Sequence, residues 1–114
     1  MEKRIFAHFY RSETGKESVR DWLLELSKED RKIVGVDIKT VEFGWPIGMP
    51  TCRPMGDGIF EVRSNLTGRR ISRVLFMISE GNMVLLHAFI KKTQKTPSED
   101  LGLARRRRKE VLES

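Results

Sequence analysis

Residues 59–91 read IFEVRSNLTGRRISRVLFMISEGNMVLLHAFIK. Their alternation of apolar and polar residues, interrupted twice by glycine-containing turns, predicts three β-strands over 59–64, 71–79 and 83–91. The short turns predict that these strands form an antiparallel meander. The middle strand is apolar on both faces except near its start, so we expect it to lie centrally with a helix layer against one face of the sheet.

The residues before this meander predict a first strand and a helical hairpin. Residues 5–10 are rich in aromatic and β-branched side chains and predict a strand. From Lys16 onward the apolar residues follow helical spacing. That spacing is carried by Val19, Trp22, Leu23 and Leu26. Ser27, with Asp30 three residues later, resembles a capping box and predicts the start of a second helix, which ends at Gly44.

The remaining segments complete a single α+β domain over residues 1–114. Residues 45–58 are rich in proline and glycine and predict an irregular connection before the meander. Pro97 to Asp100 predict the start of a last helix, with acidic residues at its N-terminus and a basic run toward its C-terminus. The predicted order is β-α-α-β-β-β-α. The length of 114 residues suits one hydrophobic core.

The composition excludes several classes of protein. The single cysteine, Cys52, cannot form an internal disulfide, and no Cys and His residues stand at zinc-ligand spacing. No apolar run approaches the ~20 residues that span a bilayer, and the N-terminal residues lack the apolar stretch of a signal peptide. We therefore expect a cytoplasmic protein with no membrane partner, no metal and no cofactor.

The basic charge of the chain is concentrated in its second half. Residues 1–62 contain 10 Lys and Arg against 11 Asp and Glu, whereas residues 63–114 contain 12 against 5. This excess favours a polyanionic partner, nucleic acid being the commonest, with a merely soluble basic surface as the alternative. The run 105–109 is either a solvated helix face or a phosphate-binding segment. The RNA-binding candidates are these basic residues and one aromatic residue, Phe89, whose ring can stack on a base. They are Arg69, Arg70, Phe89, Lys95, Arg105, Arg106, Arg107, Arg108 and Lys109.

Alternation along the strands places charged residues on shared faces. Glu61 and Arg63 lie on one side of their strand. Arg73 lies within the apolar run of the next strand, where a guanidinium requires a carboxylate or a phosphate partner. A salt bridge to Glu61 and a phosphate site are both open at this point. His87 shares a face with Phe89 and is either a satisfied core residue or a catalytic one.

If the strands pair in order, their basic residues cluster in one region of the sheet and form a phosphate site. RNA cleavage needs a base for the 2′-hydroxyl proton, an acid for the leaving 5′-oxygen and cations on the phosphorane. Glu61 and His87 are the acid–base candidates, and a lysine can act only if neighbouring positive charges lower its pKa. The candidate catalytic residues are Arg63, Arg73, Lys91, Lys92, Glu61 and His87.

Three motifs resemble a known family. They are Gly58-Ile-Phe-Glu-Val-Arg63, Arg73-Val-Leu-Phe76 and Leu85-Leu-His-Ala-Phe-Ile-Lys-Lys-Thr-Gln-Lys-Thr-Pro97. With the following helix, which contains Ala104-Arg105, they resemble the phage-derived, HigB-like branch of the RelE/ParE toxin superfamily. The resemblance covers nearly the whole chain.

The resemblance implies a type II toxin whose sheet is similar to that of small ribonucleases. Such a toxin cuts messenger RNA in the ribosomal decoding site without a metal, and an antitoxin from the adjacent gene, often of helix-turn-helix type, neutralises it. By position, the resemblance assigns phosphate binding and stabilisation to Arg63, Arg73 and Lys91 or Lys92. Relatives often have tyrosine where this chain has Ser72 and Phe76, and the only tyrosine here is Tyr10 on the first strand.

The sequence therefore predicts a ribosome-dependent endoribonuclease toxin whose partners are the ribosome, messenger RNA and a cognate antitoxin. Alanine at Arg73 is expected to abolish growth arrest and to leave the fold intact. Three alternatives stay open: a ParE-like inhibitor of DNA gyrase, which binds protein and does not cut RNA; a non-enzymatic basic nucleic-acid-binding module that uses the last helix; and an inactive remnant of the toxin fold.

Overall fold

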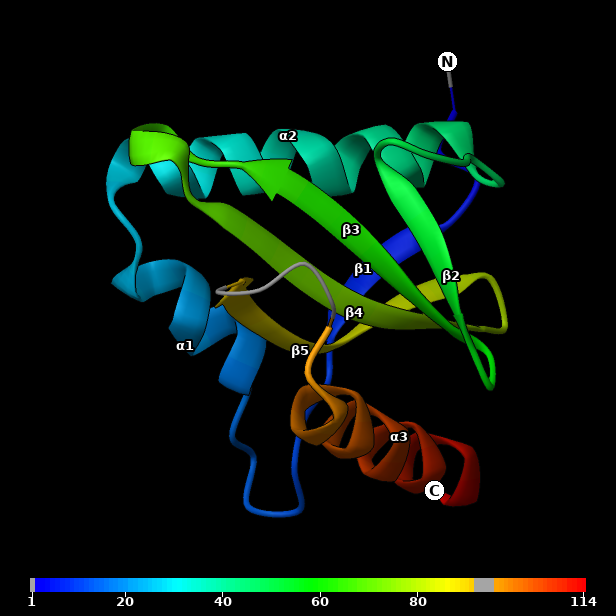
Figure 1. Cartoon of the computed structure of the whole chain (residues 1–114). Coiled ribbons are helices and arrows are strands. Elements are labelled where there is room, and N and C mark those ends of the chain that lie inside the picture. The colour runs from blue at the N-terminus through cyan, green and yellow to red at the C-terminus, as the bar shows by residue number, and fades with distance from the viewer. Residues whose placement is uncertain (1, 92–95) are drawn as a thin grey trace.

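The computed structural model describes residues 2–91 and 96–114, which form a five-stranded sheet and three α-helices (Figure 1). In chain order the elements are β1 (Phe6–Phe9), α1 (Ser18–Glu25), α2 (Lys28–Gly44), β2 (Cys52–Gly56), β3 (Ile59–Asn65), β4 (Ile71–Ser79), β5 (Asn82–Lys91) and α3 (Ser98–Glu113). The α+β class predicted from the sequence is confirmed. None of the described helices is long and apolar enough to cross a membrane.

The strands lie in the order β1-β5-β4-β3-β2, with β1 parallel to β5 and every other pair antiparallel. The predicted meander of β3, β4 and β5 is confirmed, and β4 is the central strand. Glu80 and Gly81 form the two-residue turn between β4 and β5, and both have the positive φ that a type I′ turn requires.

One part of the predicted organisation was wrong. Residues 45–58 do not form an irregular connection throughout, because β2 lies within them and pairs with β3. β2 contains Pro54, and a proline is accommodated there because β2 is an edge strand, where an N–H need not join the ladder. Asp57 and Gly58 make the turn between the two strands, both with positive φ.

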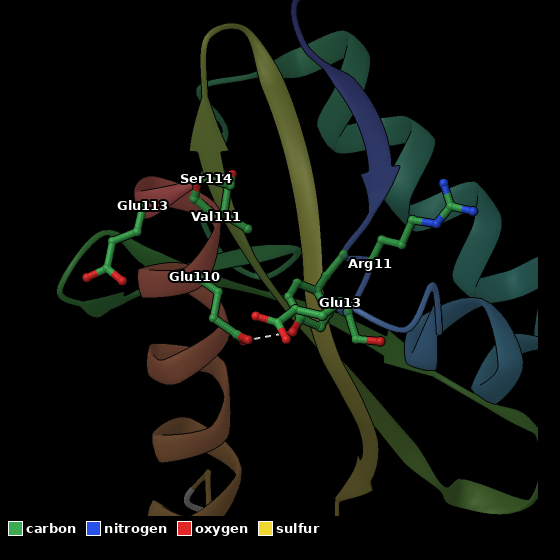
Figure 2. A pocket seen from close by; sticks show the side chains of 8 residues that line it. Arg11, Glu13, Glu110, Val111, Glu113 and Ser114 are labelled. Carbon is green, nitrogen blue, oxygen red and sulfur yellow. Dashed lines mark hydrogen bonds between the residues drawn. The ribbon is translucent and has the colours of Figure 1, made fainter.

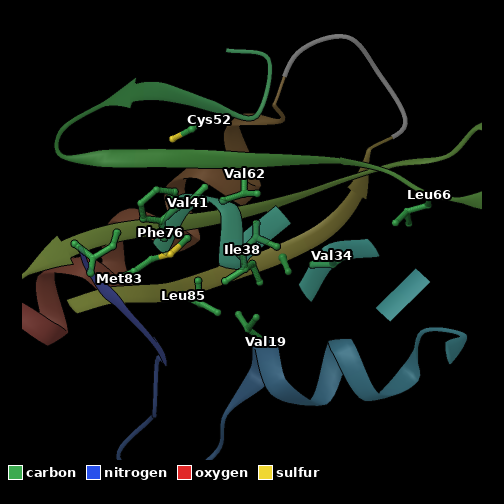
Figure 3. Packing of buried hydrophobic residues seen from close by; sticks show 13 residues of the cluster. Val19, Val34, Ile38, Val41, Cys52, Val62, Leu66, Phe76, Met83 and Leu85 are labelled. Carbon is green, nitrogen blue, oxygen red and sulfur yellow. The ribbon is translucent and has the colours of Figure 1, made fainter. Parts of the chain in front are cut away.

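The predicted helix layer against one face of the sheet is present, and a helix covers the other face as well. α1 and α2 cover the first face, where the main core includes Val19, Val34, Val41 and Phe76 (Figure 3). α3 packs against β5 and β4 on the other face, over a smaller core that contains Leu75 and Ala104 (Figure 1). The candidate site lies on this second face.

The predicted N-terminus of α2 is confirmed, but only half of the capping box forms. The Ser27 hydroxyl accepts a hydrogen bond from the Asp30 N–H at 3.1 Å. The second bond of a capping box would run from the Ser27 N–H to the Asp30 carboxylate, but this carboxylate has other partners. It accepts hydrogen bonds from the backbone N–H and hydroxyl of Thr67, at 3.0 and 2.9 Å, and pairs with Arg70. Asp30 thus ties α2 to the segment between β3 and β4.

Candidate active site

Strand pairing brings the charged residues of four strands to the α3 side of the sheet. Arg63, Arg73 and Phe89 are Cα partners in one row, and Glu61 lies in the adjacent row with His87, separated from it by Leu75 of β4. Directly paired residues point to the same face of a sheet. The strand register, which the sequence alone could not give, therefore places most of the predicted catalytic residues together.

Lys91, the last residue of β5, completes this cluster of positive charge. Burial lowers the pKa of its ammonium group from the ordinary value of 10.5. The charges of Arg73 and Arg63 lower this pKa further, and Arg53 contributes in the same direction. We call Arg53, Arg63, Arg73 and Lys91 the cationic cluster. The positive charges of these four side chains repel one another, so binding of a negatively charged phosphate among them is favourable.

Sequence reasoning missed Arg53, because residues 45–58 were expected to be irregular. Arg53 is the Cα partner of Glu61 and is exposed on the α3 side of β2. Two signals could have found it: the Asp57-Gly58 pair, which is a common hairpin turn, and the alternation of Cys52, buried in the main core, with Arg53.

Arg73 and Glu61 form a buried ion pair, which confirms the salt bridge that the sequence left open. The Arg73 side chain is 3% exposed and that of Glu61 is 2% exposed, and the Arg73 guanidinium donates to Glu61 Oε1. Thr96 lies at the same point, where its hydroxyl donates to Glu61 Oε2 at 2.6 Å. Both carboxylate oxygens of Glu61 therefore have partners. As placed here, Glu61 orients Arg73, and its acid–base role stays a prediction.

His87 faces α3 and is not a core residue, since its side chain is 17% exposed. Its Nε2 lies 2.6 Å from Oδ1 of Asp100 in the first turn of α3. The imidazole is also stacked on Phe89, with ring centroids 5.6 Å apart and ring planes at 25°. Sequence reasoning considered Asp100 only as a charge at the start of a helix.

The basic run 105–109 does not form one uniform surface, because successive helical residues point in different directions. Arg105 pairs with Asp57 of the β2–β3 turn at 2.9 Å. Arg108 also reaches this turn, where a Cβ on Gly58 would lie 3.0 Å from its guanidinium. The hairpin that carries Arg53 is thereby held against α3.

Arg107 points inward and fixes the helix to the sheet. Its guanidinium donates to the Leu86 carbonyl at 2.8 Å and lies over the Tyr10 ring, 5.1 Å from the centroid. Arg106 and Lys109 are exposed. These two are the members of the predicted RNA-binding run that are best placed to meet a large polyanion.

A hollow near the end of α3 does not suit a phosphate. It lies between the residues after β1 and the last turn of α3, and Glu13, Glu110 and Glu113 line it (Figure 2). At its base the Tyr10 hydroxyl donates to Glu110 Oε2 at 2.7 Å. Burial and this carboxylate raise the pKa of Tyr10. The chain's one tyrosine is thus a packing residue between β1 and α3.

The other predicted RNA-binding residues lie apart from the cationic cluster or outside the described part of the chain. Arg70 pairs with the Asp30 carboxylate. Hydrogen bonds from Thr67 and the charge of Arg70 lower the pKa of Asp30 to about 2, against the effect of burial. Arg69 is exposed in the turn between β3 and β4. Lys92 and Lys95 lie outside the described residues.

A comparison with protein families shows the family of the chain. The sequence model of the family described as phage-derived protein Gp49-like matches residues 21–109. The chain belongs to the Gp49-like family. This family is part of the RelE/HigB-type superfamily of toxin–antitoxin toxins. No curated protein matches the chain.

The Gp49-like match extends from α1 into α3 and so includes the whole cationic cluster, His87 and Asp100. Membership indicates a toxin of a toxin–antitoxin pair, and therefore a cognate antitoxin as partner. Among residues 2–91 and 96–114, no three His, Cys, Asp or Glu side chains are grouped to hold a metal ion. The candidate site, as far as the described residues form it, contains the cationic cluster, the imidazole of His87 and the paired carboxylates of Glu61 and Asp100.

Proposed function

We propose that this Gp49-like protein is a HigB-like toxin that cleaves messenger RNA on the ribosome. The observation that carries the proposal is the cationic cluster, which joins four strands beside the paired imidazole of His87. Toxins of this superfamily are generally endoribonucleases, which supports the same conclusion.

The proposed reaction is attack of the ribose 2′-oxygen on the adjacent phosphorus. His87 takes the 2′-hydroxyl proton, the new O2′–P bond forms, and the P–O5′ bond breaks. The 5′-oxygen leaves with a proton from Lys91 or from water. The products are a 2′,3′-cyclic phosphate and a 5′-hydroxyl end.

The cationic cluster stabilises the extra negative charge of the phosphorane. Arg73 is held in place by Glu61, so its guanidinium is oriented before RNA binds. Preorganised donors of this kind are among the largest contributions to catalysis. Phe89 lies in the same row as Arg73, and in the proposal its ring stacks on a base. Lys91 is a better proton donor than an ordinary lysine, because its pKa is lowered.

Dependence on the ribosome is part of the proposal because in-line attack needs a defined RNA conformation. Arg53 and Arg63 of the cationic cluster are exposed on the sheet face. A flexible single strand must be held in the conformation that in-line attack needs before these cations can act on it. The decoding site would supply that conformation, and the exposed Arg106 and Lys109 would dock on ribosomal RNA.

The test is a cell-free translation reaction on one defined message, in which new 5′ ends are mapped by primer extension. We expect cuts in the translated message and none in the same RNA without ribosomes. Cuts in naked RNA would indicate a free-standing ribonuclease. Intact message with normal protein yield would refute the proposal and favour the gyrase inhibitor, which a supercoiling assay would then test. Binding to naked nucleic acid without toxicity would favour the non-enzymatic module.

A further inference from the structure

We infer that Asp100 is the positioning residue for His87, so that the first turn of α3 is part of the active site. This inference rests on the proposed function, which it deepens by identifying what orients the general base.

A β-bulge directs His87 toward α3. Leu75 of β4 pairs with His87, but the next residue, Phe76, pairs with Leu85, so that Leu86 is an extra residue in β5. In a regular strand Leu86 and His87 would face opposite sides. Here Leu86 packs in the smaller core under α3, and His87 contacts Asp100 of the same helix. The bulge thus turns the imidazole to the face that carries the cationic cluster, as bulges near active sites often do.

The contact with Asp100 selects one form of the imidazole. An ionised carboxylate only accepts hydrogen bonds, so His87 Nε2 carries the hydrogen in the 2.6 Å contact. In the neutral ring, Nδ1 is then the nitrogen that can accept a proton. The stacked ring of Phe89 holds the plane of the imidazole. When Nδ1 takes the 2′-hydroxyl proton, the carboxylate stabilises the resulting imidazolium.

The charged groups around His87 suit this role. Positive side chains near a histidine oppose its protonation, and Asp100 is the carboxylate that directly offsets them. The charged side chains on this face come from α3 and from strands β2 to β5. They include Asp100 and Arg107 of α3, Arg53 of β2, Glu61 and Arg63 of β3, Arg73 of β4 and Lys91 of β5.

Asp100→Asn tests the inference, because the asparagine side chain keeps an acceptor oxygen and nearly the same shape but has no charge. The matched control is Glu99→Gln, which removes a charge from the same first turn at an exposed residue. Cleavage of a translated message is measured under single-turnover conditions with saturating ribosomes. We expect Asp100→Asn to lower the rate about 10- to 100-fold, as loss of a carboxylate behind a functional imidazole commonly does. Half-saturation by ribosomes and the rate of Glu99→Gln should change less than about twofold.

A second measurement does not depend on cleavage. The chain has two histidines, His8 and His87, so the ring-nitrogen NMR signals of each imidazole can be assigned, with His8 as the internal reference. These signals show which ring nitrogen carries the hydrogen. In the wild type we expect the Nε2–H form of His87, which donates to Asp100, and in Asp100→Asn we expect a larger share of the Nδ1–H form. A contact that merely held α3 in place would not select between the two forms.

The outcomes separate the two proposals. If the wild-type protein cuts no RNA, the proposed function is wrong, and the catalytic role of Asp100 falls with it. If the wild type cuts RNA and Asp100→Asn cuts at the same rate, or the tautomer of His87 does not change, Asp100 has no positioning role and the proposed function stands. A selective loss of rate together with the changed tautomer supports both.

Discussion

The buried ion pair between Arg73 and Glu61 makes a quantitative prediction about stability. Arg73→Met removes the guanidinium and leaves the Glu61 carboxylate, which is 2% exposed, with Thr96 as a hydrogen-bond donor. Breaking a buried pair by removal of one partner typically costs about 3–5 kcal/mol. A domain of this size has a free energy of unfolding of about 5–15 kcal/mol. Arg73→Met alone, or Glu61→Leu alone, should therefore lose a large share of the free energy of unfolding.

The double variant Arg73→Met/Glu61→Leu removes both charges and leaves two apolar side chains in the same space. Replacement of a whole buried pair by apolar residues is often nearly neutral. We expect urea unfolding to show a loss of about 3–5 kcal/mol in each single variant and a smaller loss in the double variant than in either, with an unchanged slope. Arg63→Met, at an exposed position, is the control and should change stability by less than about 0.5 kcal/mol.

The same variants separate folding from catalysis. Arg73→Ala alone is a poor test of activity, because it also leaves a buried charge unpaired, contrary to the expectation that the fold would be undisturbed. The double variant should be folded and inactive, since it lacks the guanidinium to which the proposed function assigns stabilisation of the phosphorane. Single variants that each cost less than about 1 kcal/mol, or a double variant whose loss equals the sum of the two, would refute the coupling described here.

Three further predictions concern other parts of the chain. Burial raises the pKa of the Cys52 thiol to about 11, so a thiol reagent at pH 8 should react with Cys52 only after urea unfolds the protein. Asp30→Asn should lower the urea midpoint at pH 7. The difference from wild type should disappear as the pH falls from 4 toward 2, because the pKa of Asp30 is lowered from 3.8 to about 2 and the stability that its carboxylate contributes is lost when it is protonated. Replacement of Arg106 and Lys109 by glutamine should weaken ribosome binding and reduce its salt dependence without lowering the melting temperature, whereas Arg107→Gln should lower that temperature.

Much of the fold could be predicted because local sequence signals agreed with the final structure. β4 was predicted with the correct limits, since its apolar run lies between two glycine-containing turns. Ser27 was correctly predicted to cap α2, because its hydroxyl needs only the Asp30 N–H three residues later. β2 was missed because Pro54 suggested a loop, although an edge strand tolerates proline.

The candidate site depended on features that no local pattern contains. The row of Arg63, Arg73 and Phe89 follows from strand register, which is set by the packed core. The contact of His87 with Asp100 depends on a bulge and on the docking of α3, and both are tertiary effects. The Asp30 carboxylate likewise found partners about 40 residues away in place of its local one.

The central claim is that the α3 side of the sheet, through its cationic cluster, cleaves messenger RNA. Arg63 tests it most directly, because this arginine is exposed and its replacement should not disturb the fold. The measurement is the single-turnover rate of cleavage of a translated message by wild type, by Arg63→Ala and by the control Arg20→Ala. Arg20 is an exposed arginine of α1, on the opposite side of the sheet.

We predict that Arg63→Ala cuts at least about 100-fold more slowly than wild type, as loss of one preorganised donor to the transition state commonly does. Arg20→Ala should cut at the wild-type rate. Equal rates for all three proteins, with melting temperatures unchanged, would contradict the assignment of RNA cleavage to this face.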